Sequence, residues 1–331
     1  MGRLATPALC SEFPMTTLSQ WLAAQPVDAK LASVVATMAA ASAEISGVLR
    51  QAPIAGQTGL AGATNVQGEA QKALDVISND IVLNHLRANA AISILISEEL
   101  DEAVDMSSQG RFIVATDPLD GSSNLDVNVT VGTIFSVLAS AGGLLQKGTA
   151  QLAAGYVAYG PATSLVVRIA GETSVFTLDA DGQWQQTVAA ARIPPASGEF
   201  AINTARERFW DAATIGYVRE SVAGESGPAG KRYNMRWVGS MVADVHRILM
   251  RGGIFLYPLD SETASKGGRL RLLYEANPMA WLVEGAGGSS TTGRQGILAV
   301  EPTDIHQRVP VILGSAEEVQ RVVGWYGRGM S

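Results

Sequence analysis

Residues 112–124 read Phe-Ile-Val-Ala-Thr-Asp-Pro-Leu-Asp-Gly-Ser-Ser-Asn, an apolar run followed by the two aspartates Asp117 and Asp120. The first five residues predict a buried strand, because the run is short, apolar and bounded by an acid. Pro118 restrains the turn that follows, and Gly121 permits unusual backbone angles. Two aspartates three residues apart can therefore point to one centre at the end of this strand.

A second pair of acids, Glu98 and Glu99, follows the apolar run Ala91–Ile96, which also predicts a buried strand. Acids in loops after buried strands can converge and still be hydrated. Several carboxylates without Cys or His favour a hard cation such as magnesium or manganese over zinc. If a helical turn starts in Gly121–Asn124, its N–H groups would hold a phosphate beside that ion. For either pair alone, the alternative is a turn with solvated acids.

Three other acids are weaker signals. Glu69 and Asp75 lie near Lys72 on a predicted helix, where acids usually form a solvated face. Glu275 directly follows the apolar run Leu270–Tyr274, as expected of an acid at the end of a strand. Taken alone, each of these acids is interpreted as structural.

Apolar periodicity divides the chain into helices and strands around a central break. Pro194-Pro-Ala-Ser-Gly198 favours an extended linker, so we place a domain boundary there, between residues 1–195 and 196–331. Helices are predicted over 31–49, 67–86, 209–223, 241–251 and 278–285, with a Gly/Ala-rich loop over 55–64. Strands are predicted over 91–96, 112–116, 131–138, 154–169, 174–178 and 254–257.

Composition narrows the class of protein. The 331 residues are 47% hydrophobic and 17% charged, which is typical of a globular enzyme. A net charge of -7 and the lack of any Lys/Arg run argue against a nucleic-acid partner. The single Cys10 excludes an intramolecular disulfide, and we find neither a signal peptide nor an uncharged apolar span of membrane length. These features predict a cytoplasmic protein that does not act at a membrane.

Four motifs together resemble the class I fructose-1,6-bisphosphatases, over a region from about Thr17 to Leu313. They are Ser97-Glu-Glu99, Asp117-Pro-Leu-Asp-Gly-Ser-Ser-Asn124, Val238-Gly-Ser-Met-Val-Ala-Asp-Val-His-Arg247 and Leu272-Leu-Tyr-Glu-Ala-Asn-Pro-Met279. The first two occur in a wider superfamily of lithium-sensitive, metal-dependent phosphatases. The last two, with Gly252-Gly-Ile-Phe-Leu-Tyr257, look specific to the fructose bisphosphatases. The resemblance implies an α+β/α/β layered sandwich, the sugar phosphatase fold, with alternating α-β-α-β-α layers in two domains.

The resemblance also implies a reaction, in which an activated water attacks the 1-phosphate of fructose 1,6-bisphosphate in gluconeogenesis or the Calvin cycle. Magnesium, or manganese, would be held by Glu98, Asp117, Asp120, Glu275 and the Leu119 carbonyl, with Glu69 near a third metal position. Asp75 and Glu99 would orient and deprotonate the water. By this carry-over, residues 1–195 are the metal-binding domain and residues 196–331 the sugar-phosphate-binding domain.

The remaining implied residues bind the substrate. Gly121, Ser122 and Ser123 would hold the 1-phosphate, Met241 would contact the sugar, and Asn203, Tyr257, Arg236 and Arg269 would surround the 6-phosphate. Arg236 would reach this site from a neighbouring subunit, and the resemblance implies that the assembly is a homotetramer. An arginine fork gives bidentate recognition of phosphate, so full activity would then depend on assembly.

The chain departs from the family pattern at the 6-phosphate end. Trp237 and Arg206 stand where the family has tyrosines, and Arg269 stands where it has a lysine. A pocket altered in this way leaves sedoheptulose-1,7-bisphosphatase open as an alternative or second activity. The N-terminal segment also lacks the residues on which inhibition by AMP depends in this family, so the resemblance does not imply control by AMP. A sugar-phosphate sensor without activity is the alternative from another class, but the complete set of acids argues against it.

Overall fold

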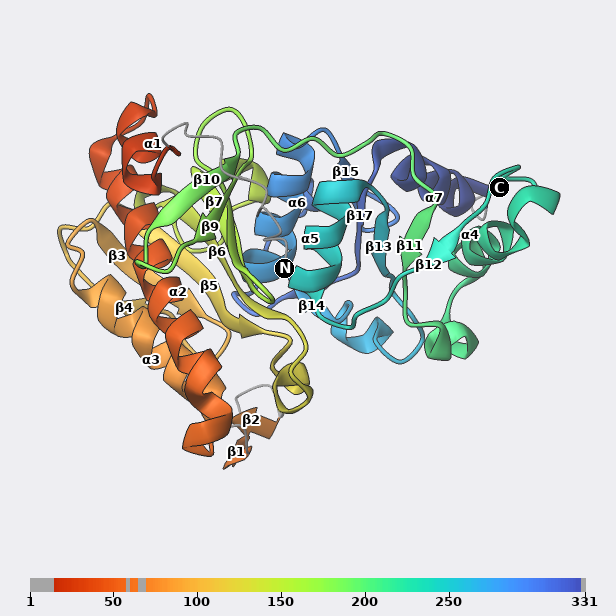
Figure 1. Cartoon of the computed structure of the whole chain (residues 1–331). Helices are drawn as coiled ribbons and strands as arrows, with labels where there is room; N and C mark the ends of the chain where they lie inside the picture. The colour runs from red at the N-terminus through yellow and green to blue at the C-terminus, as the bar shows by residue number, and fades with distance from the viewer. Residues whose placement is uncertain (1–14, 58–59, 65–69, 329–331) are drawn as a thin grey trace, which may run out of the picture.

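The computed structural model describes residues 15–57, 60–64 and 70–328. Its elements stack in five layers, helix, sheet, helix, sheet and helix, from left to right in Figure 1. This arrangement confirms the expected α-β-α-β-α sandwich. It follows from burial, because each sheet has two apolar faces that only helices on both sides can cover.

The α-helices are α1 (Leu18–Ala24), α2 (Ala29–Ala55), α3 (Ala73–Arg87), α4 (Ala212–Ala223), α5 (Met241–Arg251), α6 (Asn277–Gly285) and α7 (Ala316–Arg328). The first sheet and a small hairpin contain β1 (Leu60–Thr64), β2 (Ala70–Lys72), β3 (Ile92–Ser97), β4 (Val104–Asp105), β5 (Phe112–Asp120), β6 (Val131–Ala139), β7 (Ala153–Tyr159), β8 (Thr163–Arg168), β9 (Ser174–Leu178) and β10 (Trp184–Val188). The later strands are β11 (Glu199–Ala201), β12 (Asn234–Met235), β13 (Ile254–Tyr257), β14 (Leu270–Arg271), β15 (Ser289–Thr291), β16 (Arg308–Val309) and β17 (Val311–Gly314).

The first sheet has eight strands in the order β10-β9-β8-β7-β6-β5-β3-β4, and β3–β5 is its parallel pair. Helices α1, α2 and α3 cover one of its faces (Figure 1). Val34 and Met38 of α2 and Phe135 of β6 are fully buried in the core between them. The long apolar helix α2 is therefore a core element of this sheet.

Of the helices in the described ranges, α2 is the one that is long and apolar enough to cross a membrane. Half of its most apolar window of 18 residues is buried inside the protein, as in a core helix. Lys30, Glu44 and Arg50 interrupt its apolar sequence. The helix is thus weak evidence for a membrane span.

Helices α5 and α6 form the middle layer and contact both sheets. Their side chains share one buried cluster with Tyr156 and Val166 of the first sheet and with Phe255 and Leu313 of the second. The second sheet runs β12-β11-β13-β17-β15, and α4 and α7 cover its outer face (Figure 1). The inner faces of the two sheets are therefore joined by one apolar core.

Four sequence-based expectations were wrong in detail. The strand expected over 154–169 is in fact two antiparallel strands, β7 and β8. The expected loop over 55–64 contains the strand β1, which pairs with β2, and the expected helix over 67–86 begins only at Ala73. Glu275 does not end a strand: it lies in a π-helix, Leu272–Ala276, that follows the two-residue strand β14. An apolar run such as Leu270–Tyr274 satisfies a strand or a buried helical turn equally well, so periodicity does not separate them.

Candidate active site

Strand β5 positions Asp117 and Asp120, and all nine of its residues are buried. Its register against β6 changes between these residues, since Asp117 pairs with Ile134 and Asp120 with Gly132. Three residues of β5 thus oppose two of β6. In a regular strand, residues three apart point to opposite faces, whereas one extra residue returns both to the same side. The bulge is what brings the two aspartates together.

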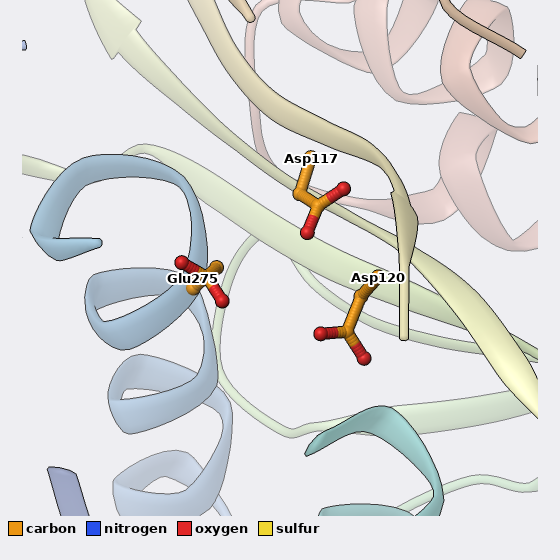
Figure 2. A group of neighbouring side chains, drawn as sticks. All are labelled: Asp117, Asp120 and Glu275. Carbon is orange, nitrogen blue, oxygen red and sulfur yellow. The ribbon is translucent and has the colours of Figure 1, made fainter. Parts of the chain in front are cut away.

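The third acid, Glu275, comes from the π-helix between the two sheets, and Figure 2 shows the three carboxylates pointing toward one another. One oxygen from each of Asp117, Asp120 and Glu275 lies within 4.8 Å of the others. π-helical turns widen the backbone spiral and occur often at functional sites. The trio offers the oxygen-rich donor set that a hard cation prefers.

The three carboxylates are buried and repel one another. Burial is the largest cause that raises the pKa of Asp117 and of Glu275 well above the usual range, and nearby Glu98 adds to both. Burial also raises the pKa of Asp120 to about 7, although the Val242 N–H and Ser240 hydroxyl act in the opposite direction. A bound cation would remove this repulsion, so the cluster fits a divalent metal.

Arg271 balances part of this negative charge, and the sequence interpretation missed it. Its Nη2 atom lies 2.9 Å from Glu98 Oε1, and its backbone N–H donates to Glu275 Oε2 at 2.6 Å. Arg271 is only 5% exposed. A buried arginine inside an apolar run is rare unless it is paired, and this was the available signal.

Asp120 is also fixed by the start of α5. Its Oδ2 atom accepts a hydrogen bond from the Val242 N–H at 3.1 Å and lies 3.5 Å from Ser240 Oγ. Asp117 Oδ1 accepts a hydrogen bond from the N–H of the buried Leu119 at 2.9 Å. Both aspartates are therefore held in place by backbone donors from separate elements.

A 3₁₀ helix, Ser122–Val127, begins directly after β5. Gly121 precedes it with φ of 78°, in the left-handed region, and a Cβ there would lie 3.0 Å from Ser240 Oγ. Ser122 is half-buried and Ser123 is exposed. Their N–H groups thus open a helical turn beside the acids, as the phosphate hypothesis requires.

The acids expected to act on water lie around the same strand ends. Asp75 is buried in the first turn of α3, and Glu99 is half-buried just after β3. Ser97 connects the two elements, because its hydroxyl donates to Asn79 of α3 at 2.7 Å and accepts from the Glu99 N–H at 3.3 Å. Glu69 lies outside the described residues.

At the other end of the site, Asn203, Tyr257, Trp237 and Arg206 line one small pocket. Trp237 stacks on Phe255 with 5.8 Å between ring centroids. The Arg206 guanidinium lies 2.6 Å from Asp260 and 3.1 Å from Glu262, so these acids already neutralise it. The sequence placed Arg206 at this end of the site without revealing its pairing with these acids.

Three other residues expected to bind substrate lie outside this pocket. Met241 is buried as the first residue of α5. Arg269 is exposed just before β14. Arg236 is exposed after β12, with its Nε 3.7 Å from Glu199 of the same chain.

Comparisons with known proteins agree with this geometry. Residues 13–189 match the family model described as fructose-1-6-bisphosphatase, N-terminal domain, and residues 193–327 match its C-terminal domain. The class 1 fructose-1,6-bisphosphatase of Shewanella amazonensis is 49% identical over 94% of this chain and 100% of its own length. That of Neisseria meningitidis serogroup A is 50% identical over 87% of this chain and 91% of its own length.

A solved structure is also similar. The holo form of Leishmania major fructose-1,6-bisphosphatase superposes with a TM-score of 0.89 at 34% identity, covering 95% of this chain and 99% of that one. The similarity thus includes both sheets and the helices between them. This chain belongs to the class I fructose-1,6-bisphosphatase family.

Proposed function

We infer that this chain hydrolyses fructose 1,6-bisphosphate to fructose 6-phosphate and phosphate. The observation that carries this function is the trio Asp117, Asp120 and Glu275 beside the helical turn at Ser122, in a chain of this family. The acids suit a metal, the turn suits a phosphate, and the two adjoin. The names of the relatives favour the six-carbon bisphosphate over sedoheptulose 1,7-bisphosphate.

We propose magnesium as the metal, with manganese as the alternative. Asp117, Asp120 and Glu275 would hold it together with Glu98 and the Leu119 carbonyl, and Glu69 would serve a third position. When bound, such an ion lowers the pKa of water and stabilises negative charge on phosphate oxygens. The burial and mutual repulsion of the three carboxylates support this assignment, since both make the cluster unfavourable without a cation.

The remaining polar groups would orient the reactants. Asp75 and Glu99 would hold the attacking water and accept its proton, which their positions beside the ends of α3 and β3 support. The N–H groups of Gly121, Ser122 and Ser123 would hold the reacting phosphate at the start of the 3₁₀ helix. These contacts fix the phosphorus relative to the water, which is the main task of a phosphoryl-transfer enzyme.

The far phosphate would bind at the pocket of Asn203 and Tyr257, with Met241 against the sugar and Arg269 nearby. We propose that Arg236 completes this pocket in a neighbouring copy, within a homotetramer. Its exposure supports this role, because an arginine at the surface can reach another chain.

Three broader assignments are also proposed. The chain divides after about residue 195, which the separate eight-stranded and five-stranded sheets support. The enzyme acts in the cytoplasm, in gluconeogenesis or the Calvin cycle. The acidic net charge of -7 is consistent with a small-molecule substrate and with no nucleic-acid partner.

Phosphate release tests the function. Fructose 1,6-bisphosphate, sedoheptulose 1,7-bisphosphate and inositol monophosphate are each supplied with magnesium, with manganese or with EDTA, and with or without AMP. We expect release from the fructose bisphosphate, its loss in EDTA and no response to AMP. No release from that substrate with either metal would refute the function. Unchanged release by Asp120→Ala would instead favour a binding protein with contaminating activity.

Substitution of Arg236 tests the assembly. Arg236→Ala should raise KM for the fructose bisphosphate by roughly tenfold or more, the loss expected for a charge-assisted phosphate contact. Arg232→Ala, which removes another exposed arginine of the same segment, is the control. Mixing Arg236→Ala with Asp120→Ala subunits should restore part of the activity if the arginine acts across subunits, whereas no restoration would contradict that arrangement.

A further inference from the structure

The segment Arg236–Ser240 lies between the two ends of the site and contacts both. At the metal end, Asn124 Nδ2 donates to the Gly239 carbonyl at 3.2 Å, and Ser240 Oγ lies 3.5 Å from Asp120. At the far end, Trp237 stacks on Phe255, with its ring centroid 5.9 Å from that of Tyr257. The position of this segment therefore directly affects the far pocket, which is the pocket lined by Asn203, Tyr257 and Trp237.

The Asp244 carboxylate holds this segment by accepting hydrogen bonds from its backbone. Asp244, in the first turn of α5, is 0% exposed. Its two oxygens accept from the Val238 N–H at 3.1 and 3.2 Å, and Oδ2 also accepts from the Gly239 N–H at 3.1 Å. Gly239 has φ of 84°, so its N–H points inward through a backbone conformation that other residues rarely adopt.

The buried charge of Asp244 is not explained by an ion pair. Within the described ranges no cation pairs with it, and the guanidinium of Arg247 on the same helix bonds Glu199 and the Arg236 carbonyl instead. Burial raises the pKa of Asp244 to about 6, although its N–H partners and Arg247 oppose this. Burying a carboxylate without a cation is costly, and here the hydrogen bonds that it accepts from the segment offset that cost.

We propose that Asp244 is a positioning residue that fixes Arg236–Ser240 and thereby sets the affinity of the far pocket for the second phosphate. It acts through Trp237, which lines that pocket, and not on the reacting atoms. The metal end is less dependent on Asp244, because Asp120 keeps its bond to the Val242 N–H on the helix. This inference rests on the proposed function and names a determinant of its substrate specificity.

Two substitutions grade the effect. Asp244→Ala removes both acceptor oxygens. Asp244→Asn keeps one acceptor oxygen for the segment and replaces the other oxygen with an NH2 group, which cannot accept a hydrogen bond from a backbone N–H. Binding of fructose 6-phosphate, the product that carries only the far phosphate, is measured by calorimetry, and the magnesium activation constant is measured by phosphate release. We expect Asp244→Ala to weaken fructose 6-phosphate binding on the order of tenfold, the loss typical of hydrogen bonds to a charged group. Asp244→Asn should lose less, and the magnesium constant should stay within about twofold in both variants.

Glu284→Gln is the matched control, because it alters another helix carboxylate that accepts a hydrogen bond, from Ser290 at 2.6 Å, without contacting the segment. It should change neither constant. Equal shifts in the fructose 6-phosphate and magnesium constants would show a merely structural role and overturn the inference. So would unchanged product binding in Asp244→Ala. If Asp244→Ala does not fold, Asp244→Asn against Glu284→Gln gives the same decision. A wild type that binds fructose 6-phosphate but releases no phosphate would refute the proposed function alone.

Discussion

Replacing Asp120 by asparagine is expected to stabilise the metal-free protein at high pH while abolishing activity. Asp120 is 7% exposed, and its pKa is raised from 3.8 to about 7, chiefly by burial. Asparagine has nearly the same shape and can still accept the hydrogen bond of the Val242 N–H. The substitution therefore removes the charge and retains most of the packing.

The sign and size follow from linkage between protonation and folding. Below pH 3.8 the carboxyl is protonated in both states, so Asp120 contributes no pH dependence. As the pH rises from there to about 7, the unfolded chain ionises while the folded site resists, and stability falls. The difference of three pH units corresponds to a loss on the order of 4 kcal/mol, complete above pH 7.

Urea unfolding in EDTA at pH 5 and pH 8 measures this effect in the wild type, Asp120→Asn and Asp181→Asn. Asp181 is an exposed aspartate in the turn between β9 and β10 and serves as the control. At pH 8, Asp120→Asn should be the most stable, by up to about 4 kcal/mol. Magnesium should narrow this difference, because ligand at 100 times Kd stabilises the wild type by about 2.7 kcal/mol and the variant by less.

Two results would refute this reasoning. Metal-free Asp120→Asn with no more stability than the wild type at pH 8 would mean that the carboxylate is not strained by burial. Equal stabilisation by Asp181→Asn would assign the effect to overall charge.

Three further predictions concern residues around the site and in the outer layer. Gly121→Ala should lower kcat at least tenfold, because the φ of 78° at Gly121 and the nearby Ser240 hydroxyl both disfavour a Cβ there. The control is Gly171→Ala, where φ is 66° and the space is open, so that the change should cost only about 1–2 kcal/mol of stability. Equal kcat values for the two variants would contradict this prediction. Glu318→Gln should lower the free energy of unfolding by about 3 kcal/mol with kcat unchanged. The reason is that the fully buried Glu318 accepts hydrogen bonds from Tyr217, Tyr233, Lys231 and Arg321. Glu317→Gln, at an exposed position, is the control, and equal urea midpoints for the two variants would contradict a stabilising role of these hydrogen bonds. Arg271→Met should lower the stability of the metal-free protein by about 3 kcal/mol, because it removes the ion pair with the Glu98 carboxylate. Magnesium should recover part of the lost stability. A variant whose thermal midpoint does not change with magnesium would contradict this explanation.

Local signals allowed several elements to be predicted from the sequence. The helix 241–251 and the strands 174–178 and 254–257 were confirmed with their bounds. Gly252 and Gly253 end the helix and open the strand, and both have positive φ, so glycine marks this boundary clearly. The acids Asp117 and Asp120 were visible for a similar reason, since they interrupt a buried run.

Contacts between distant segments were not predictable. The bulge that aligns Asp117 and Asp120 depends on the register with β6, which one strand alone does not specify. The π-helix around Glu275 depends on the Arg271 N–H, which its own carboxylate accepts, and on pairing with the segment near Gln307. The pairing of Arg206 with Asp260 depends on a loop 54 residues away. In each case tertiary packing decided between local options of similar free energy.

The middle layer of α5 and α6 has a consequence for how the molecule comes apart. Because these helices bury side chains against both sheets, neither half of the chain contains its complete core. A fragment cut near residue 195 would expose Tyr156 and Val166 on one side or Phe255 and Leu313 on the other. The two halves should therefore melt in a single cooperative transition, and each expressed separately should aggregate or remain unfolded until the other is supplied.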